Sequence, residues 1–270
     1  MTGDDADAGI DLGTQNLRFE RVGSVGWVTV DRPEARNALT SAMYLGVRRA
    51  VDRVNSDRAL SALVITGVGD VFIPGGEMSG RHEDGNQELV SAMGVDVLPF
   101  RTIRNSRAPV VAAVNGICQG GGLIIAMCSD IAVASDRATF RAPETLRGVV
   151  DANLAAMLPV HVGVANARDL LMSGRRVSAD EACRMGLVSR VVPHEDLRGA
   201  ALDAAGDLLR AAPDARSRVK ALINARYGVI DEITFHASLE SDEMREGFRA
   251  FTEKRTPEWV PEEFRSGDRL

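Results

Sequence analysis

The triple glycine Gly120–Gly122 is the part of the sequence best suited to chemistry. It follows an apolar run, Pro109 to Val114, that predicts a buried strand, and it precedes a segment that predicts a helix over residues 123–129. The first backbone N–H groups of a helix have no intrahelical partner and lie at the positive end of its dipole. The turn could therefore form an oxyanion hole, which binds charge that develops on a carbonyl oxygen. Alternatively, the glycines could serve only a tight turn or close packing of helix and strand.

Other motifs in the chain favour the oxyanion hole, because their order resembles the signature of the enoyl-CoA hydratase/isomerase (crotonase) family. The resemblance extends from about Leu17 to Trp259, which is nearly the whole chain. The motifs that carry it include Asp31-Arg-Pro-Glu-Ala-Arg-Asn-Ala-Leu39, Phe72-Ile-Pro-Gly-Gly-Glu77, Asn115-Gly-Ile-Cys-Gln-Gly-Gly-Gly122, Ser129-Asp-Ile-Ala-Val-Ala134, Pro143-Glu144 and Ala250-Phe-Thr-Glu-Lys-Arg255.

The resemblance assigns roles to three residues that would act on a thioester. The backbone N–H groups of Gly76 and Gly121 would bind the thioester oxygen, and Glu144 would be the general acid and base at the carbon skeleton of the acyl group. An enolate held in such a hole makes the carbon acidic enough for a carboxylate to move its proton. Taken alone, Pro143-Glu144 is also typical of an acid that stabilises a helix N-terminus.

Position 124 departs from the family pattern. Family hydratases carry a second glutamate there, twenty residues before the position of Glu144, whereas this chain has Ile124. Two carboxylates hold and polarise one water in a hydratase, so the loss of one is expected to slow hydration by about 10² to 10⁴ fold. One carboxylate can still move a proton between the α and γ carbons, as in members that resemble Δ3,Δ2-enoyl-CoA isomerases. Isomerase-type proton transfer is therefore the favoured activity.

Asp151 stands where family hydratases usually have proline. Members that resemble naphthoate synthases carry an aspartate at this alignment position. Asp151 could be a second polar group in the pocket, which would support an alternative function as an enoyl-CoA hydratase, or it could only cap a loop. A further alternative is a catalytically quiet acyl-CoA-binding protein that keeps the same scaffold.

Four positions are candidates for contact with coenzyme A, which would be part of the substrate, so no permanently bound cofactor is expected. The resemblance places the loop of Arg36 and Ala38 beside the coenzyme A moiety, where a basic side chain could meet a phosphate. Gly75 precedes the first oxyanion donor. Lys254 matches a lysine that approaches the nucleotide end of coenzyme A, often across a subunit contact. A solvated turn arginine and a solvated helix-end lysine are the alternatives.

The elements that must position these residues follow from the hydrophobic periodicity. Residues 17–22 and 27–30 predict a hairpin, residues 62–66 a buried strand, and the spacing of Met43, Val47, Val51 and Val54 a helix between them. Such alternation predicts an α/β fold with parallel strands. The resemblance implies a crotonase-like spiral of ββα units with a helical C-terminal trimerisation region, and trimers that often pair into hexamers.

These patterns divide the chain into three parts. We expect a flexible N-terminus over residues 1–12, a spiral core with the acyl-CoA site over residues 13–193, and a helical oligomerisation region over residues 194–270. The periodicity predicts helices over residues 154–164, 168–172, 200–211, 214–227 and 233–251, and a capping box at Ser178. The polar segment 81–87, after a glycine-rich loop, is expected to face the substrate.

Composition excludes several classes of function. The net charge is −6 and no broad basic surface is evident, which argues against nucleic acid as a partner. The three cysteines lack a pairing or metal-binding pattern and the four histidines are scattered, so no metal site is predicted. No apolar run approaches the ~20 residues of a membrane span, and no secretory signal pattern is present. These observations predict a cytoplasmic protein, and the family resemblance implies an enzyme of lipid metabolism.

Overall fold

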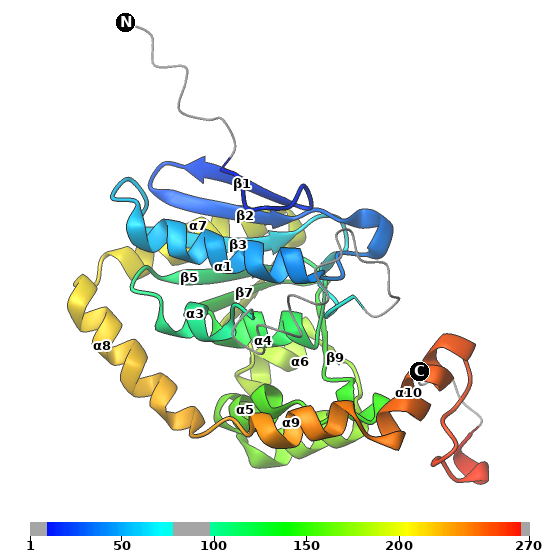
Figure 1. Cartoon of the computed structure of the whole chain (residues 1–270). Helices are drawn as coiled ribbons and strands as arrows, with labels where there is room; N and C mark the ends of the chain where they lie inside the picture. The colour runs from blue at the N-terminus through cyan, green and yellow to red at the C-terminus, as the bar shows by residue number, and fades with distance from the viewer. Residues whose placement is uncertain (1–9, 78–97, 266–270) are drawn as a thin grey trace, which may run out of the picture.

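The computed structural model describes residues 10–77 and 98–265, which fold around two sheets (Figure 1). The larger sheet has the strand order β1-β2-β3-β5-β7-β10. Its first two strands form the predicted antiparallel hairpin, and all other neighbours are parallel. The strands are β1 (Leu17–Val22), β2 (Val25–Val30), β3 (Ala62–Gly67), β5 (Val110–Val114), β7 (Ile131–Ser135) and β10 (Arg190–Val192).

A smaller sheet, absent from the sequence prediction, has the order β4-β6-β8-β9. Its strands are two or three residues long, too short for periodicity to reveal: β4 (Val71–Ile73), β6 (Ile117–Gln119), β8 (Thr139–Arg141) and β9 (Val177–Ser178). Along the chain, β4, β6 and β8 each follow a strand of the larger sheet, and β4, β6 and β8 pair in parallel. This repeat confirms the predicted crotonase-like α/β spiral.

Helices cover both faces of the larger sheet. Helix α1 (Ser41–Ser56) buries the predicted residues Met43, Val47 and Val51 completely, in a core that it shares with α4 (Gly121–Cys128) and α5 (Ala152–Ser173). Helix α7 (Leu197–Leu209) packs small alanine side chains into a second core with Trp27 and Val64. The larger sheet is therefore shielded on both faces.

Several helix boundaries differ from the prediction. Residues 152–173 contain two helical stretches, as predicted, but the break lies at Gly163, whose φ of 77° is non-helical, a few residues before the predicted gap. The stretch 233–251 is divided into α9 (Glu232–Leu239) and α10 (Asp242–Glu253), because the Ser241 side chain accepts from the Met244 N–H and starts a new helix. The other helices are α3 (Phe100–Asn105), α6 (Ala179–Met185), which has the predicted Ser178 cap, and α8 (Pro213–Asn224).

The ends and loops add three findings. Leu12, predicted to belong to a flexible terminus, is 1% exposed, and its carbonyl accepts from the Arg49 side chain. The polar segment 81–87 lies outside the described residues. None of the described helices combines the length and apolarity needed to cross a bilayer. Trimer formation concerns contacts between chains and stays a prediction.

Asn37 ties the Arg36 loop to the strand that leads into the glycine loop at position 76. Its side chain is 1% exposed, accepts from the Arg32 N–H at 3.0 Å and donates to the carbonyls of Val68 and Val71 at 3.1 and 2.7 Å. Its φ is 62°, in the left-handed region. Asn37 thus holds two loops in register with a backbone conformation that few residues tolerate.

Substitution of Asn37 should separate these two contributions. Asn37→Ala leaves buried backbone groups without partners and places alanine at positive φ, so the free energy of unfolding should fall by about 2–4 kcal/mol. Asn37→Gly removes the same side chain without the backbone strain and should lose about 1 kcal/mol less. Urea unfolding of both variants measures the difference, and equal losses would contradict the role given to the left-handed conformation.

Candidate active site

A cavity of about 680 Å³ brings together most of the residues that the sequence singled out. Its walls come from the Arg36 loop, α1, the Gly76 loop, α4, the start of α5 and the C-terminal helices. The predicted residues that line it are Arg36, Ala38, Gly75, Gly76, Gly121, Ile124, Glu144 and Asp151. Lys254 is not among the lining residues.

The backbone around Gly76 leaves its N–H without a partner among the described residues. Leu39 forms an isolated parallel bridge with Gly76: the Leu39 N–H donates to the Gly75 carbonyl at 3.0 Å, and the Glu77 N–H donates to the Leu39 carbonyl at 2.9 Å. In such a bridge the polar groups of the middle residue point away from the partner strand. The Gly76 N–H is therefore directed away from Leu39. Gly75 has a φ of 118°, a conformation that only glycine adopts easily.

Gly121 supplies a second N–H with no partner in residues 10–77 and 98–265, because it is the first residue of α4. The intrahelical bonds of this turn begin with the Ile124 N–H, which donates to the Gly120 carbonyl. The two glycine loops lie against each other, since a methyl group on Gly75 would be 4.0 Å from the Gly121 nitrogen. Both loops border the cavity, as an oxyanion hole requires.

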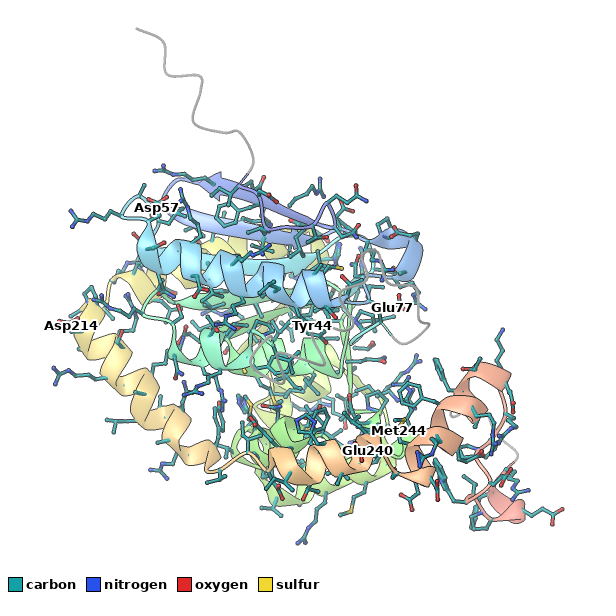
Figure 2. The ribbon with its side chains drawn as sticks, in the orientation of Figure 1. Tyr44, Asp57, Glu77, Asp214, Glu240 and Met244 are labelled. Atoms are coloured by element: carbon teal, nitrogen blue, oxygen red, sulfur yellow. The ribbon has the colours of Figure 1, made fainter. Side chains whose placement is uncertain are left out.

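Tyr44 on α1 also reaches this point, and sequence reasoning missed it (Figure 2). A methyl group on Gly121 would lie 2.2 Å from the Tyr44 hydroxyl oxygen, and one on Gly76 would lie 3.6 Å from it. One hydroxyl group thus faces both glycines, which places them around a common space. The sequence signal that could have identified Tyr44 is its type and place: a tyrosine, which carries a hydroxyl group, stands next to the core residue Met43 in the helix that follows the Arg36 loop.

Glu144 lies against the triple glycine, at the start of a short 3-10 helix over residues 144–147. A methyl group on Gly120 would be 2.6 Å from its Oε1 atom, so the turn must be free of side chains for the carboxylate to fit. Within the described part of the chain, Oε2 is buried without a hydrogen-bond partner. Burial and, secondly, the charge of Asp151 raise the pKa of Glu144 to about 8. Such a group can both accept and return a proton near neutral pH.

Asp151 fits both alternatives that the sequence left open. Its Oδ1 atom accepts from the Leu154 N–H at 2.9 Å, so it caps the N-terminus of α5. It also lines the cavity, where burial raises its pKa, although backbone hydrogen bonds from Leu154 and Asn153 oppose the shift. Capping and a polar role in the cavity are therefore compatible.

Position 124 does not carry a glutamate. Ile124 lines the cavity and is 1% exposed, so the position of the hydratase carboxylate is occupied by packed hydrocarbon. The C-terminal helices add Phe235, Leu239, Phe248 and Phe251 to the lining. These side chains make part of the cavity wall apolar.

Arginines surround this apolar region, and sequence reasoning did not select them. Arg147 lies over the ring of Phe251, with its guanidinium carbon 4.6 Å from the ring centroid. Arg141 and Arg147 both act to lower the pKa of Glu144, but burial outweighs them. Across residues 10–77 and 98–265, no cluster of three or more His, Cys, Asp or Glu side chains is arranged to hold a metal ion.

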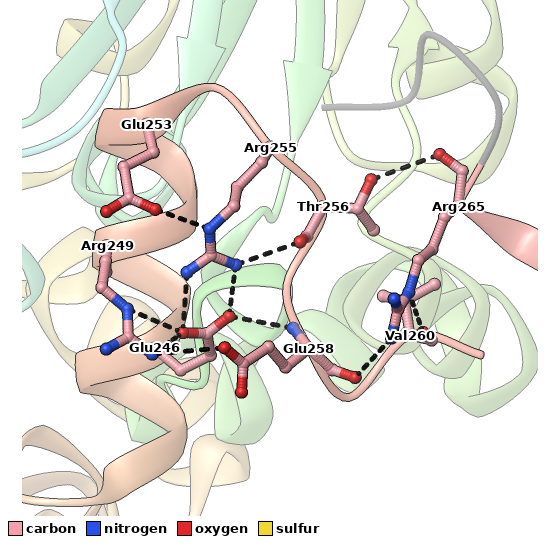
Figure 3. A network of polar contacts seen from close by, with 8 residues as sticks. All are labelled: Glu246, Arg249, Glu253, Arg255, Thr256, Glu258, Val260 and Arg265. Atoms are coloured by element: carbon pink, nitrogen blue, oxygen red, sulfur yellow. Dashed lines mark hydrogen bonds and ion pairs between the residues drawn. The ribbon is translucent and has the colours of Figure 1, made fainter. Parts of the chain in front are cut away.

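The rim of the cavity presents cationic groups from two segments. Arg36 is exposed, with a φ of 51°, and lines the cavity. Arg255 also lines it and is fixed by an ion pair with Glu246 at 2.6 Å, in a network with Arg249 and Glu258 (Figure 3). Lys254 is exposed beside Arg255, so its predicted contact with coenzyme A stays untested.

Comparisons with known proteins agree with this geometry. The family model for enoyl-CoA hydratase/isomerase matches residues 20–262. A crotonyl-CoA hydratase of Syntrophomonas wolfei is 34% identical over 259 residues, covering 91% of this chain and 98% of the relative.

Solved structures show the same fold. An enoyl-CoA hydratase/isomerase from Pseudoalteromonas atlantica superposes with a TM-score of 0.78 at 30% identity, covering 91% of this chain and 100% of the other. A monofunctional enoyl-CoA isomerase from M. smegmatis gives 0.68 at 26% identity, with 85% and 100% covered. The similarity thus includes proteins described as hydratases and one described as an isomerase.

The two donor glycines should respond differently to alanine. A methyl group on Gly76 meets ordinary contacts, whereas one on Gly121 collides with the Tyr44 hydroxyl, and neither glycine has a positive φ. Gly76→Ala should therefore leave turnover of an acyl-CoA substrate nearly unchanged, while Gly121→Ala should lower kcat by about 10² fold or more. Steady-state assays of the matched pair measure this. Equal losses would contradict the described packing around Tyr44.

Glu144 should make stability depend on pH. In the unfolded chain its carboxyl has its ordinary pKa of 4.5, against about 8 when folded. Between these values the unfolded state releases the proton and the folded state keeps it, so stability falls as pH rises. Glu144→Gln removes this loss, and its advantage in Tm should grow from pH 5 to pH 8. Thermal unfolding tests this, with the exposed Glu240→Gln as control; a constant difference would refute the raised pKa.

Proposed function

Because the chain belongs to the enoyl-CoA hydratase/isomerase family of enzymes, which act on coenzyme A thioesters, we propose that it catalyses enolate chemistry on an acyl-CoA. The N–H groups of Gly76 and Gly121 bind the thioester oxygen, and Glu144 moves the proton. The observation that carries the proposal is the position of the Glu144 carboxylate, against the glycine turn and with Oε2 unpaired among the described residues.

The substrate enters with its acyl chain toward Ile124 and the phenylalanines of the C-terminal helices, which offer apolar contacts. Its coenzyme A moiety lies at the rim, where Arg36 can pair with a phosphate and the backbone of Ala38 is within the same wall. Coenzyme A is part of the substrate in this scheme, and no resident cofactor is required.

The proton transfer has two steps. Glu144, as the carboxylate, removes a proton from the acyl chain next to the thioester carbonyl or from its vinylogous γ position, and the electron pair moves to the thioester oxygen. The two N–H groups stabilise the oxyanion, each by an amount typically equal to about 10² to 10³ fold in rate. Protonated Glu144 then returns the proton to the other carbon, which shifts the double bond and restores the catalyst.

Isomerisation of a 3-enoyl-CoA to a 2-enoyl-CoA is the favoured form of this chemistry. It needs one base, and Glu144 is the carboxylate that lies against the glycine turn. Hydration needs a second group to hold water, and Ile124 offers only hydrocarbon at the position of the hydratase glutamate. The apolar wall also limits the space in which water could compete for the enolate.

Hydration of a 2-enoyl-CoA is the second candidate, favoured by Asp151. This carboxyl borders the cavity and lies close enough to Glu144 to raise its pKa, so it could hold the attacking water in place of the missing glutamate. The Syntrophomonas wolfei relative is described as a crotonyl-CoA hydratase. The last alternative is a catalytically quiet acyl-CoA-binding protein.

Turnover of two substrates by three proteins distinguishes the candidates. The wild type should convert a 3-enoyl-CoA faster than it hydrates crotonyl-CoA. Glu144→Gln should lower the isomerase rate by about 10² to 10⁴ fold, because the proton acceptor is lost, while Asp151→Asn should have a much smaller effect.

Other outcomes support the alternatives. Fast hydration of crotonyl-CoA that is abolished by Asp151→Asn, with no isomerase activity, would overturn the preference and favour the hydratase. Tight binding of acyl-CoA without turnover of either substrate would favour the binding protein.

A further inference from the structure

We propose that the Tyr44 hydroxyl is a third hydrogen-bond donor of the oxyanion hole, acting beside the N–H groups of Gly76 and Gly121. The proposal rests on the enolate chemistry described above. It adds a side-chain donor to a hole that the sequence predicts to be made only of backbone.

The Tyr44 hydroxyl lies close to both glycines. The Tyr44 oxygen faces both donor glycines: a methyl group on either would lie within 3.6 Å of it, and on Gly121 within 2.2 Å. The Tyr44 hydroxyl takes the space that a side chain on Gly121 would fill and lies close to where one on Gly76 would begin. A thioester oxygen bound by the N–H groups of these two glycines would therefore have the hydroxyl as a near neighbour.

The Tyr44 hydroxyl is available to bind a ligand. It makes no hydrogen bond to any residue that the structure describes, although Tyr44 is only partly exposed. A phenol in a largely apolar wall normally finds a partner. The oxyanion of the bound substrate would be that partner.

The Tyr44 hydroxyl is protonated, as a hydrogen-bond donor must be. Burial, and then the charges of Asp151 and Glu144, raise the pKa of Tyr44 far above its ordinary value of 10. The phenol therefore keeps its proton at every pH at which Glu144 titrates. It can donate to an oxyanion but does not compete with Glu144 as the base.

The ring is held in place. Tyr44 packs edge to face on Phe100, with centroids 6.1 Å apart and an angle of 86° between planes. Its helix begins at Ser41 and is capped by Thr40, whose side chain accepts from the Met43 N–H. A donor on a rigid helix is preorganised, so little reorganisation is required when charge develops.

Tyr44→Phe tests the proposal because it removes the hydroxyl and keeps the ring on Phe100. The matched control is Tyr227→Phe, the other tyrosine of the chain, whose hydroxyl bonds to His161 on α5. Tyr44→Phe should lower kcat for the thioester substrate by about 10² fold with little change in KM. Tyr227→Phe should leave kcat unchanged.

A binding measurement separates donation from a structural role. Acetoacetyl-CoA enolises, and its enolate absorbs ultraviolet light, so the absorbance of the bound ligand reports how strongly the hole stabilises an oxyanion. The wild type should shift the ligand toward the enolate. Tyr44→Phe should reverse much of this shift while keeping the Tm of the wild type, and Tyr227→Phe should keep the shift.

These measurements test the Tyr44 donor separately from the enolate chemistry on which it rests. If the wild type produces the enolate and Tyr44→Phe produces it equally well at equal kcat, the Tyr44 donor is refuted and the two-donor hole stands. If the wild type neither enolises acetoacetyl-CoA nor converts an enoyl-CoA, the proposed function itself fails. Loss of folding in Tyr44→Phe would be seen as a lower Tm, and the enolate absorbance per bound acetoacetyl-CoA, measured below that Tm, would then decide. Absorbance equal to that of the wild type would refute the Tyr44 donor.

Discussion

The structure depends on the contact between two backbone loops that carry no side chains at the point where they meet. Gly75, Gly120 and Gly121 allow this approach, and a methyl group on Gly120 or Gly121 would strike Glu144 or Tyr44. Because no side chain fills the gap, two N–H groups and a carboxylate can border one space. The larger sheet, the caps of α1 and α5 and the buried side chain of Asn37 all serve to hold these loops at this separation.

The buried Glu144 carboxylate, whose Oε2 has no partner in the part of the chain that the structure describes, opposes folding, and its surroundings must be rigid enough to retain it. Arg32 provides part of this rigidity: its guanidinium pairs with Glu77 at 2.7 Å, with both side chains nearly buried, and donates to the Ala38 carbonyl. One ion pair thus links the loop expected to face coenzyme A with the loop that carries the first donor. The stability of the surrounding core offsets the cost of burying Glu144, whose ionised form is disfavoured by burial.

Sequence patterns predicted the elements whose length lets periodicity appear, including the β1–β2 hairpin, α1 and the strand before the triple glycine. They did not predict the smaller sheet, because strands of two or three residues have no readable period. In the site, motif matching selected Gly121 and Glu144, since glycine and a carboxylate are the groups that the chemistry itself requires. Tyr44 and Arg147 were not predicted, because a single tyrosine or arginine forms no motif in the sequence. Only the fold shows that both line the cavity.

Helix α10 lies on the catalytic segment without side chains between them. A methyl group on Gly247 would be 2.5 Å from the backbone of Arg147, and one on Gly148 would be 2.4 Å from that of Glu243. Helices α9 and α10 contribute four apolar side chains to the cavity. In the proposed scheme these side chains meet the acyl group together with Ile124, while Glu144 moves the proton. Because α10 packs backbone to backbone on the Glu144 segment, changes that alter acyl preference without moving Glu144 are confined to side chains facing the cavity and exclude Gly148 and Gly247.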